Sequence, residues 1–184
     1  MMTYEGKYEV FNLEKIKTYH LSGILKLCLE PDNMRWAVET IESVTNGKIP
    51  LSIDSSYPKT IITGIENVKN KKGLLLNSIT LDESRHKELI PIAKEYDLNI
   101  IALPIDKNGI PDNADKRLCL ALKIAEHIKD NGISSGKLYI DCIIEPISIS
   151  PKNALVSLDT ISEVKKNIPE AKKIWSKKLH CNLI

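Results

Sequence analysis

Short apolar runs alternate with longer segments of helical periodicity from about residue 33 onward. The apolar runs predict strands, and they are IPLSID (49–54), LLLN (74–77), NIIALPI (99–105), KLYID (137–141) and KKIW (172–175). The periodic segments predict helices over Pro58–Val68, Glu83–Tyr96, Lys116–Lys129 and about Ala154–Lys166. This alternation of strands and helices is typical of an α/β fold.

The residues at the helix starts support this assignment. Pro58 suits the first turn of its helix, and either Ser55 or Ser56 is the expected N-cap. Asp82 is the expected N-cap of the following helix.

Two groups of apolar residues are expected to face the core from helices. Trp36 falls at helical spacing with other apolar residues, namely Met34, Val38 and Ile41. The segment from Lys116 to Lys129 carries one apolar stripe, namely Leu118, Cys119, Leu122, Ala125 and Ile128.

The predicted strands are apolar almost throughout, which is typical of a parallel sheet covered by helices. Asp54 and Asp141 end strands that lie three repeats apart, so each repeat averages about 29 residues, close to the roughly 31 of an eight-unit barrel. This spacing suits a barrel and an open doubly wound sheet equally. No GxGxxG or GxxxxGK[ST] motif follows any strand, which argues against a dinucleotide or P-loop site.

Composition narrows the class of protein. The chain has 184 residues, 42% of them hydrophobic and 27% charged, which indicates a globular domain. The formal net charge is +2, so charge gives no argument for nucleic acid binding. No stretch reaches the roughly 20 apolar residues of a membrane span. The N-terminus lacks an apolar signal core, and we expect a cytoplasmic protein.

The cysteines and histidines carry no obvious site. The four cysteines, Cys28, Cys119, Cys142 and Cys181, form no CxxC pair, so neither a disulfide framework nor a metal site is expected. Cys142 is expected to be a small buried residue. The histidines, His20, His86, His127 and His180, are dispersed, and surface or helix-end positions are expected for them.

Three predicted strands end in polar residues that a buried strand does not need: Asp54, Asn77 and Asp141. In a parallel sheet these ends share one rim, where α/β proteins place their sites. Two carboxylates and one carboxamide can pair with a small heterocycle that carries adjacent N–H groups and a carbonyl. For any one of these residues, capping of the next turn is the simpler explanation. The three together favour a shared site.

Two further carboxylates lie near the predicted rim. Asp106 ends another apolar run but lies in the sequence DKNG, so we interpret it as a turn residue. Glu145 is a candidate rim carboxylate, and the adjacent Pro146 favours a turn role for it.

The motifs around these strand ends resemble the pterin-binding family. They are EPDNMRWAVETIESV (30–44), PLSIDSSYPKTIITGI, GLLLNSIT, PIAKEYDLNIIALPIDKNGIP and LYIDCIIEPIS, in family order and spacing over about residues 30 to 170. The resemblance implies a partial (β/α)8 barrel of the dihydropteroate synthase type, with about four to five βα units. It also implies that Asp54, Asn77 and Asp141 bind the pterin.

Within this family, the methyltetrahydrofolate:corrinoid protein methyltransferases are more similar than dihydropteroate synthase. The synthase has an Asn-Asp pair where this chain has Asn77-Ser78, and a glycine-rich segment where this chain continues from Asp141 with Cys142. The resemblance implies tetrahydrofolate or methyltetrahydrofolate as substrate. It also implies cobalamin on a partner corrinoid protein, and a homodimer as one arrangement. No nucleic acid or membrane partner is expected.

The resemblance has gaps at both ends of the chain. Residues 1–29 lack the family's first motifs, residues 30–175 resemble the barrel, and residues 176–184 lack the family's GLSN-type motif. The Asn of that motif helps to activate the methyl group, and Asn182 does not align with it, so no catalytic residue is assigned. We expect an incomplete barrel with weak or no methyl transfer. Two alternatives stay open: a dihydropteroate synthase-like enzyme, and a non-catalytic remnant of the fold.

Overall fold

Six parallel β-strands lie side by side in the order in which they occur along the chain. The computed structural model describes residues 23–26 (as backbone), 30–145, 148 and 150–174. The strands are β1 (Gly23–Lys26), β2 (Leu51–Asp54), β3 (Leu75–Ile79), β4 (Asn99–Ala102), β5 (Leu138–Asp141) and β6 (Lys172–Ile174). Each strand pairs in parallel with the next one.

A helix follows each of the first five strands. The helices are α2 (Pro31–Thr45), α3 (Pro58–Asn67), α4 (Glu83–Glu95), α5 (Ala114–Asp130) and α6 (Lys152–Asn167), with the short 3-10 helix η1 (Ser135–Lys137) before β5. None of the helices in the described part of the chain combines the length and apolarity that crossing a membrane requires.

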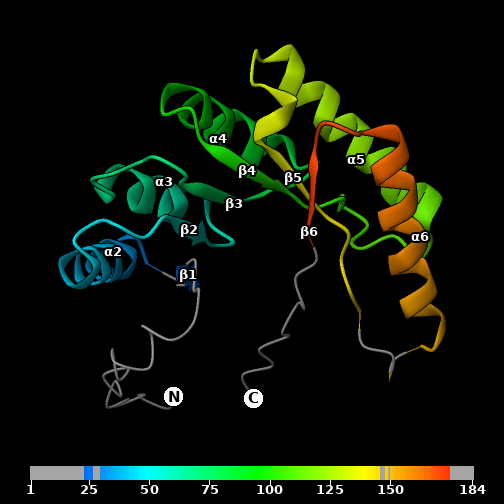
Figure 1. The fold of residues 1–184 in the computed structure, drawn as a ribbon, viewed down its shortest axis with the longest axis horizontal. Coiled ribbons are helices and arrows are strands. Elements are labelled where there is room, and N and C mark those ends of the chain that lie inside the picture. The colour runs from blue at the N-terminus through cyan, green and yellow to red at the C-terminus, as the bar shows by residue number, and fades with distance from the viewer. Residues whose placement is uncertain (1–22, 27–29, 146–147, 149, 175–184) are drawn as a thin grey trace.

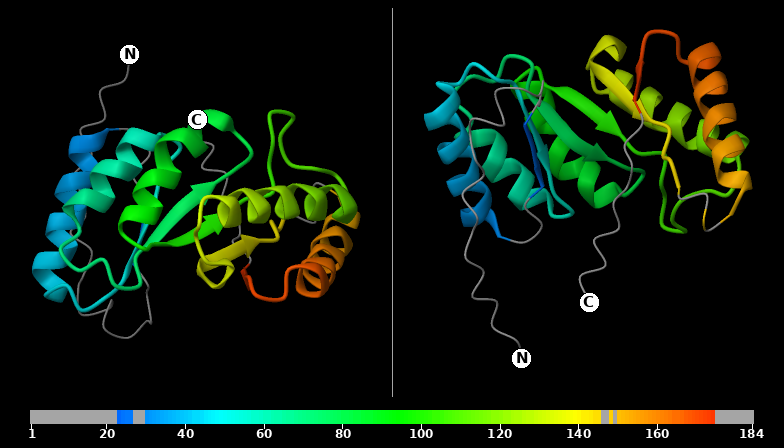
Figure 2. Two further views of the ribbon diagram at one scale, coloured as in Figure 1. Left: turned by 90° about the horizontal axis from the view of Figure 1, so that it is seen from above. Right: turned by 60° about the horizontal axis from the view of Figure 1, so that its bottom comes forward.

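The helices decide between the two folds that the repeat length allowed. Helices α2 to α6 all lie on the outer, convex side of the curved sheet (Figures 1 and 2). A doubly wound sheet has helices on both faces and a strand order that reverses. This sheet has neither property, so the predicted partial (β/α)8 barrel is confirmed, as five βα units and a sixth strand.

The core lies between the sheet and the helices. Ile53, Leu76, Ile100 and Leu138 pair in register across four adjacent strands, and each has 0% of its surface exposed. The helices cover this layer with buried apolar side chains, among them Met34, Val38, Ile61, Leu89, Ala121, Ile124 and Val164. Burial of a Leu or Ile side chain contributes about 1.5–3 kcal/mol, so this layer is the main source of stability.

Strand β1 is an element that the sequence analysis did not predict. Gly23–Lys26 lies within the segment 1–29, and its Leu25 pairs with Ile53 of β2. Four residues are too short a run to show a strand period by themselves. The strand is defined by pairing with β2, which is a tertiary contact.

The predicted capping residues differ in their outcome. Asp82 caps α4, because its side chain accepts a hydrogen bond of 2.8 Å from the backbone N–H of Ser84. The prediction of Ser55 or Ser56 as the cap of α3 is wrong, since the N-cap is Tyr57 and has no side-chain cap bond. The hydroxyl of Ser55 instead accepts from the backbone N–H of Tyr57, at 3.1 Å, in the turn before the helix.

The prediction that Trp36 lies in the core is wrong. Trp36 is 57% exposed, whereas Met34 and Val38 are fully buried. Residues two apart lie about 200° apart around a helix, so Trp36 points away when its two neighbours point inward.

The predicted apolar stripe of α5 is right in part, because Ile128 lies in the core and Leu118 and Ala125 are partly buried against it, and wrong for Cys119 and Leu122. Leu122 is 41% exposed and Cys119 is exposed, and only Ile128 of the stripe is buried. The buried residues of α5 are Arg117, Leu120, Ala121, Ile124 and Ile128. Because apolar residues cover more than half of the circumference of α5, periodicity alone could not select the face that meets the sheet.

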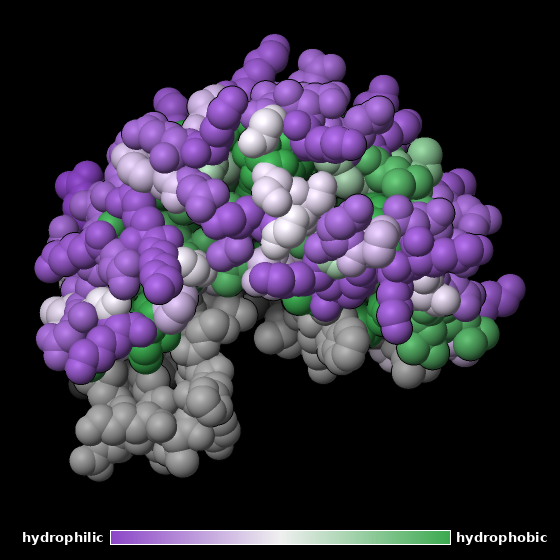
Figure 3. Space-filling view, turned by 45° about the horizontal axis from the view of Figure 1, so that its top comes forward, coloured by the Kyte–Doolittle hydropathy of each residue, from purple (hydrophilic) through white to green (hydrophobic). Residues whose placement is uncertain are grey.

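Hydrophilic side chains cover most of the outer surface of the helices, and apolar side chains are visible between them (Figure 3). A groove of about 780 Å³ lies beside α4 and α5, and its lining includes Lys87, Lys94 and Lys123. In this groove the ring of His86 stacks on that of His127, with centroids 4.4 Å apart. His127 is exposed, near the C-terminal end of α5, as expected.

The histidine pair predicts a loss of stability in acid. Burial and then the charge of His127 lower the pKa of His86, and the carbonyl of Thr80 with Asp82 and Glu83 acts in the opposite direction. The unfolded chain takes up this proton at the ordinary pKa of about 6.5, so stability falls as the pH drops below that value. Urea unfolding at pH 7.5 and pH 5.5 should show a smaller acid loss for His86→Gln than for the parent. Equal losses would contradict this.

Gly64 predicts a second stability effect. A Cβ atom at Gly64 would lie 2.6 Å from Cγ2 of Ile53 and 2.8 Å from Cγ of Met34. Overpacking of this kind costs about 1–3 kcal/mol, and the better helix propensity of Ala returns up to about 1 kcal/mol. Gly64→Ala should therefore lower the free energy of unfolding in urea by about 1–2 kcal/mol. The matched control is Gly136→Ala, where the nearest atom lies 3.6 Å away; an equal effect of the two substitutions would disprove the argument.

Candidate functional site

The three polar residues predicted at strand ends share one face of the sheet. Asp54 of β2 pairs in register with Asn77 of β3, so both lie on the same face. Asn77 pairs with Ile101 of β4, and Ile101 pairs with Tyr139 of β5. Asp141 lies two residues beyond Tyr139 and therefore also lies on this face.

This face is the concave side of the sheet, opposite the helices. The residues that precede the three polar positions, Ile53, Leu76 and Ile140, are fully buried on the helix side. Asp54 and Asp141 are the last residues of their strands, and Asn77 is two residues from the end of β3. The sheet thus brings all three to the carboxyl edge of its inner face, with β4 between Asn77 and Asp141.

The three positions differ in burial and in local bonding. Asp54 and Asn77 are partly exposed, whereas Asp141 is only 2% exposed. One carboxylate oxygen of Asp141 accepts a hydrogen bond of 2.9 Å from the backbone N–H of Ile143, which has a φ of 50°. Asp141 therefore also closes a local turn, as the simpler explanation expected for any single one of these residues.

The side chain of Arg85 joins the two loops that follow Asp54 and Asn77. Its guanidinium donates to the carbonyls of Ser56 at 2.6 Å, Ser55 at 3.2 Å and Ser78 at 2.7 Å. Nε donates to the same Ser78 carbonyl at 3.3 Å. At this point the register between β3 and β4 shifts, because Ser78 is an extra residue in β3.

The surroundings of Arg85 combine burial with negative charge. Burial lowers the pKa of the Arg85 guanidinium below its ordinary value. The carboxylates of Asp82, Asp54 and Glu88 act in the opposite direction and favour the charged form. The cation of Arg85 is thus electrostatically coupled to Asp54 at the rim.

A second arginine holds the loop that follows Asp141. Arg117 of α5 is 1% exposed and forms an ion pair of 2.6 Å with Glu145. Its other nitrogens donate to the carbonyls of Pro111 at 2.9 Å, Cys142 at 3.2 Å and Ile143 at 2.8 Å. The carboxylate of Glu145 thus stabilises the rim through this ion pair.

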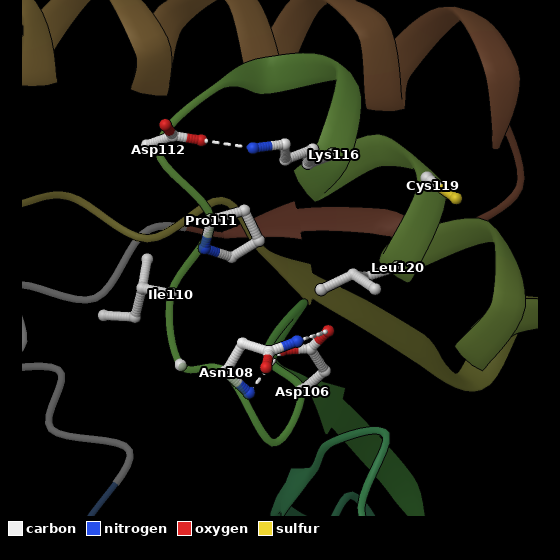
Figure 4. A pocket seen from close by; sticks show the side chains of 9 residues that line it. Asp106, Asn108, Ile110, Pro111, Asp112, Lys116, Cys119 and Leu120 are labelled. Carbon is white, nitrogen blue, oxygen red and sulfur yellow. Dashed lines mark hydrogen bonds and ion pairs between the residues drawn. The ribbon is translucent and has the colours of Figure 1, made fainter.

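A pocket of about 390 Å³ lies beside the loop between β4 and α5 (Figure 4). The pocket is lined by Asp106, Asn108, Gly109, Ile110, Pro111, Asp112, Lys116, Cys119 and Leu120, and by none of the three predicted site residues. The carboxylate of Asp106 accepts from the backbone N–H of Asn108 at 2.8 Å, which confirms its turn role. Asp112 pairs with Lys116 at 3.0 Å. The charged groups that line this pocket are therefore bonded to residues of the pocket itself. The open inner face of the sheet is the better candidate site.

The remaining candidate chemistry at the rim is limited. Cys142 is fully buried as predicted, and burial is the main cause that raises its pKa to about 11. A thiol with this pKa stays protonated near neutral pH and is a poor nucleophile. Within the described residues, His, Cys, Asp and Glu side chains form no group of three that would hold a metal ion.

Arg85 and Arg117 are the residues that the sequence analysis missed. Each lies in the first turn of a helix, where acidic residues are favoured and a cation is not. That unfavourable position was a signal in the sequence. The carbonyls that the two side chains bind lie on other loops, and these contacts only the folded chain reveals.

Comparison with known proteins agrees with this geometry. A sequence model described as "Pterin binding enzyme" matches residues 26–176. The chain belongs to the pterin-binding enzyme family. The matched range covers β2 to β6 and helices α2 to α6, so the family assignment rests on all of the described barrel portion except β1, of which only Lys26 is matched.

The curated relatives of this pterin-binding chain are distant. Methionine synthase of Mycobacterium leprae is 25% identical over 135 residues, which cover 68% of this chain and 11% of that protein. The methylcorrinoid:tetrahydrofolate methyltransferase of Eubacterium limosum is 22% identical over 144 residues, which cover 77% of this chain and 52% of that protein. The chain therefore matches about a tenth of the first relative and about half of the second.

Proposed function

We propose that this chain binds a reduced folate through the inner face of its partial barrel and belongs to a methyltransferase that exchanges methyl groups with a corrinoid protein. The observation that carries the proposal is the placement of Asp54, Asn77 and Asp141 on one face and one edge of the sheet, in a chain of the pterin-binding family. The methyltransferase branch is supported by the name of the E. limosum relative.

The chemistry of the three side chains fits a pterin ring. The pterin presents adjacent N–H donors on one edge, which a carboxylate accepts in pairs, and a carboxamide both donates and accepts. Asp54 and Asn77 occupy paired positions on adjacent strands, so they meet neighbouring atoms of a flat ligand. Asp141 approaches from beyond β4, which leaves the width of one strand for the ring.

In the proposed reaction the residues of this chain orient the pterin. The methyl group leaves the N5 nitrogen of methyltetrahydrofolate, the electron pair of the broken C–N bond stays on nitrogen, and that nitrogen gains a proton. An amine is a poor leaving group, so hydrogen bonding at N5 lowers the barrier. A corrinoid on a partner protein would supply the methyl acceptor, and the electron pair of the new cobalt–carbon bond would come from its cobalt. Asp54, Asn77 and Asp141 contribute orientation, because bidentate pairing fixes the plane of the ring.

The direction of transfer is a separate question from binding. The name of the E. limosum relative gives tetrahydrofolate as the partner of a methylcorrinoid, so methyl transfer to the folate belongs to the proposal as well. An enzyme lowers the barrier in both directions equally, and the same three residues serve both. A corrinoid protein as partner and a cytoplasmic location complete the proposal.

Loss of either carboxylate should weaken folate binding. A hydrogen bond to a charged group contributes about 1.5–3 kcal/mol, which corresponds to a roughly 10-fold to 100-fold higher Kd. Isothermal titration of the full chain with methyltetrahydrofolate should show this increase for Asp54→Ala and for Asp141→Ala. Asn77→Ala should weaken binding less, because its amide is neutral.

The matched control is Asp159→Ala, which removes an exposed carboxylate of α6, on the side of the sheet opposite the site. Its Kd should equal that of the parent. A parent chain that releases no heat with the folate would overturn the proposal and favour the non-catalytic remnant. Binding unchanged by all three site substitutions would show that the folate occupies another surface.

Methyl transfer by this chain alone should be slow. The family's methyl-activating Asn has no counterpart that the sequence analysis could assign, and loss of one such donor costs about 10²–10³ in rate. Single-turnover transfer between methyltetrahydrofolate and a corrinoid protein, followed by the corrinoid absorbance, should therefore be weak or undetectable. A rate typical of enzymes, about 1–10³ s⁻¹, would contradict this expectation. Incorporation of para-aminobenzoate instead would favour the dihydropteroate synthase alternative.

A further inference from the structure

The guanidinium of Arg85 connects the backbone next to two residues of the proposed site. The Ser55 and Ser56 carbonyls directly follow Asp54, and the Ser78 carbonyl directly follows Asn77. One rigid, planar group thus sets the distance between the ends of β2 and β3. A backbone hydrogen bond adds to this link, because the Ser55 N–H donates to the Asn77 carbonyl at 3.3 Å.

A contribution to stability does not by itself explain an arginine at position 85. Arg85 lies in the first turn of α4, where the helix dipole disfavours a cation. Among the described residues no carboxylate lies within ion-pair distance of Arg85, and its hydrogen-bond acceptors there are backbone carbonyl oxygens. Burial costs this guanidinium hydration, and the carboxylates of Asp82, Asp54 and Glu88 offset the cost only from beyond ion-pair distance. What the Arg85 guanidinium does provide is fixed geometry, because its planar group of N–H donors binds three carbonyls at once.

Arg117 repeats this arrangement one unit further along the sheet. It also lies in the first turn of its helix, and it binds the carbonyls of Cys142 and Ile143, which directly follow Asp141. The N–H of Ile143 in turn donates to the carboxylate of Asp141. Each polar residue of the proposed site is therefore followed by backbone that an arginine side chain holds in place.

We propose that Arg85 is a positioning residue that sets the spacing and direction of Asp54 and Asn77 for the pterin ring, and that Arg117 does the same for Asp141. This inference rests on the proposed folate-binding function. Neither arginine touches the pterin in this proposal, and each acts through the backbone next to a binding residue. A lysine keeps the charge of Arg85, but its three donors sit on one nitrogen at the end of a flexible chain, so it cannot fix the spacing of the three carbonyls as the planar fork of an arginine does.

The test measures folate affinity and stability in parallel. The full chain, Arg85→Lys and Arg85→Gln are titrated calorimetrically with methyltetrahydrofolate, and each is unfolded in urea. We expect both variants to fold and to bind roughly 10-fold to 100-fold more weakly, which is the loss expected when a charge-assisted hydrogen bond to the ligand is misaligned. Addition of a few millimolar guanidinium ion should restore part of the affinity of Arg85→Gln. A residue with a general stabilising role would not show that rescue.

The control is Arg35→Gln on α2, an exposed arginine paired with Asp32 at 3.4 Å. It should bind the folate as the parent does. If Arg85→Lys and Arg85→Gln bind as tightly as the parent, the positioning role is overturned and the proposed function stands. If the parent itself does not bind, the proposed function fails and this inference fails with it. If neither variant folds, Arg85 is a structural residue and the inference is overturned as well.

Variants of the Arg117–Glu145 ion pair should affect stability and folate affinity differently from the Arg85 variants. Arg117 is buried and paired with the partly exposed Glu145, so its removal leaves that carboxylate and three backbone carbonyls without their donor and should lower stability. Glu145→Gln keeps the hydrogen bond to Arg117 and the carbonyl contacts, and it should fold and bind the folate within a few-fold of the parent. A 100-fold weaker affinity for Glu145→Gln would assign Glu145 itself to the site.

Discussion

The in-register pairing of parallel strands is the constraint on which this structure depends. Ile53, Leu76, Ile100 and Leu138 form one continuous apolar layer under the helices. Because side chains alternate between the two faces of a strand, this layer forces the next residue of each strand onto the concave face. A slip of one residue in any strand would move its polar residue into the core, where an unpaired carboxylate costs several kcal/mol.

At the carboxyl edge of the sheet, the backbone carbonyls need hydrogen-bond donors. Loops after parallel strands leave carbonyls without ladder partners, and these groups must find donors elsewhere. Arg85 and Arg117 supply the donors from the first turns of α4 and α5. The same bonds that satisfy the loop carbonyls also hold the residues before them, so local satisfaction and site geometry depend on the same two side chains.

Most of the fold could be predicted from the sequence, and the errors have physical causes. The five apolar runs became β2 to β6, since a run of buried β-branched and leucine residues needs few tertiary cues. Strand β1 was missed, because pairing with β2 defines it more than its own composition. The face of α5 was only partly right, because the helix is apolar over most of its circumference. The capping of α3 was wrong because Ser55 bonds in the preceding turn.

By itself, the sequence determined the order of strands and helices, the caps at Asp82 and the polar residues at three strand ends. Each of these features depends on residues that are close together in the sequence, through local periodicity, turn chemistry and the cost of burying polar groups. Only the tertiary structure decided that the helices lie on one side, that Asp54, Asn77 and Asp141 share the inner face, and that Arg85 and Arg117 hold their loops. These facts depend on strand register and on contacts between distant segments, which no local pattern contains.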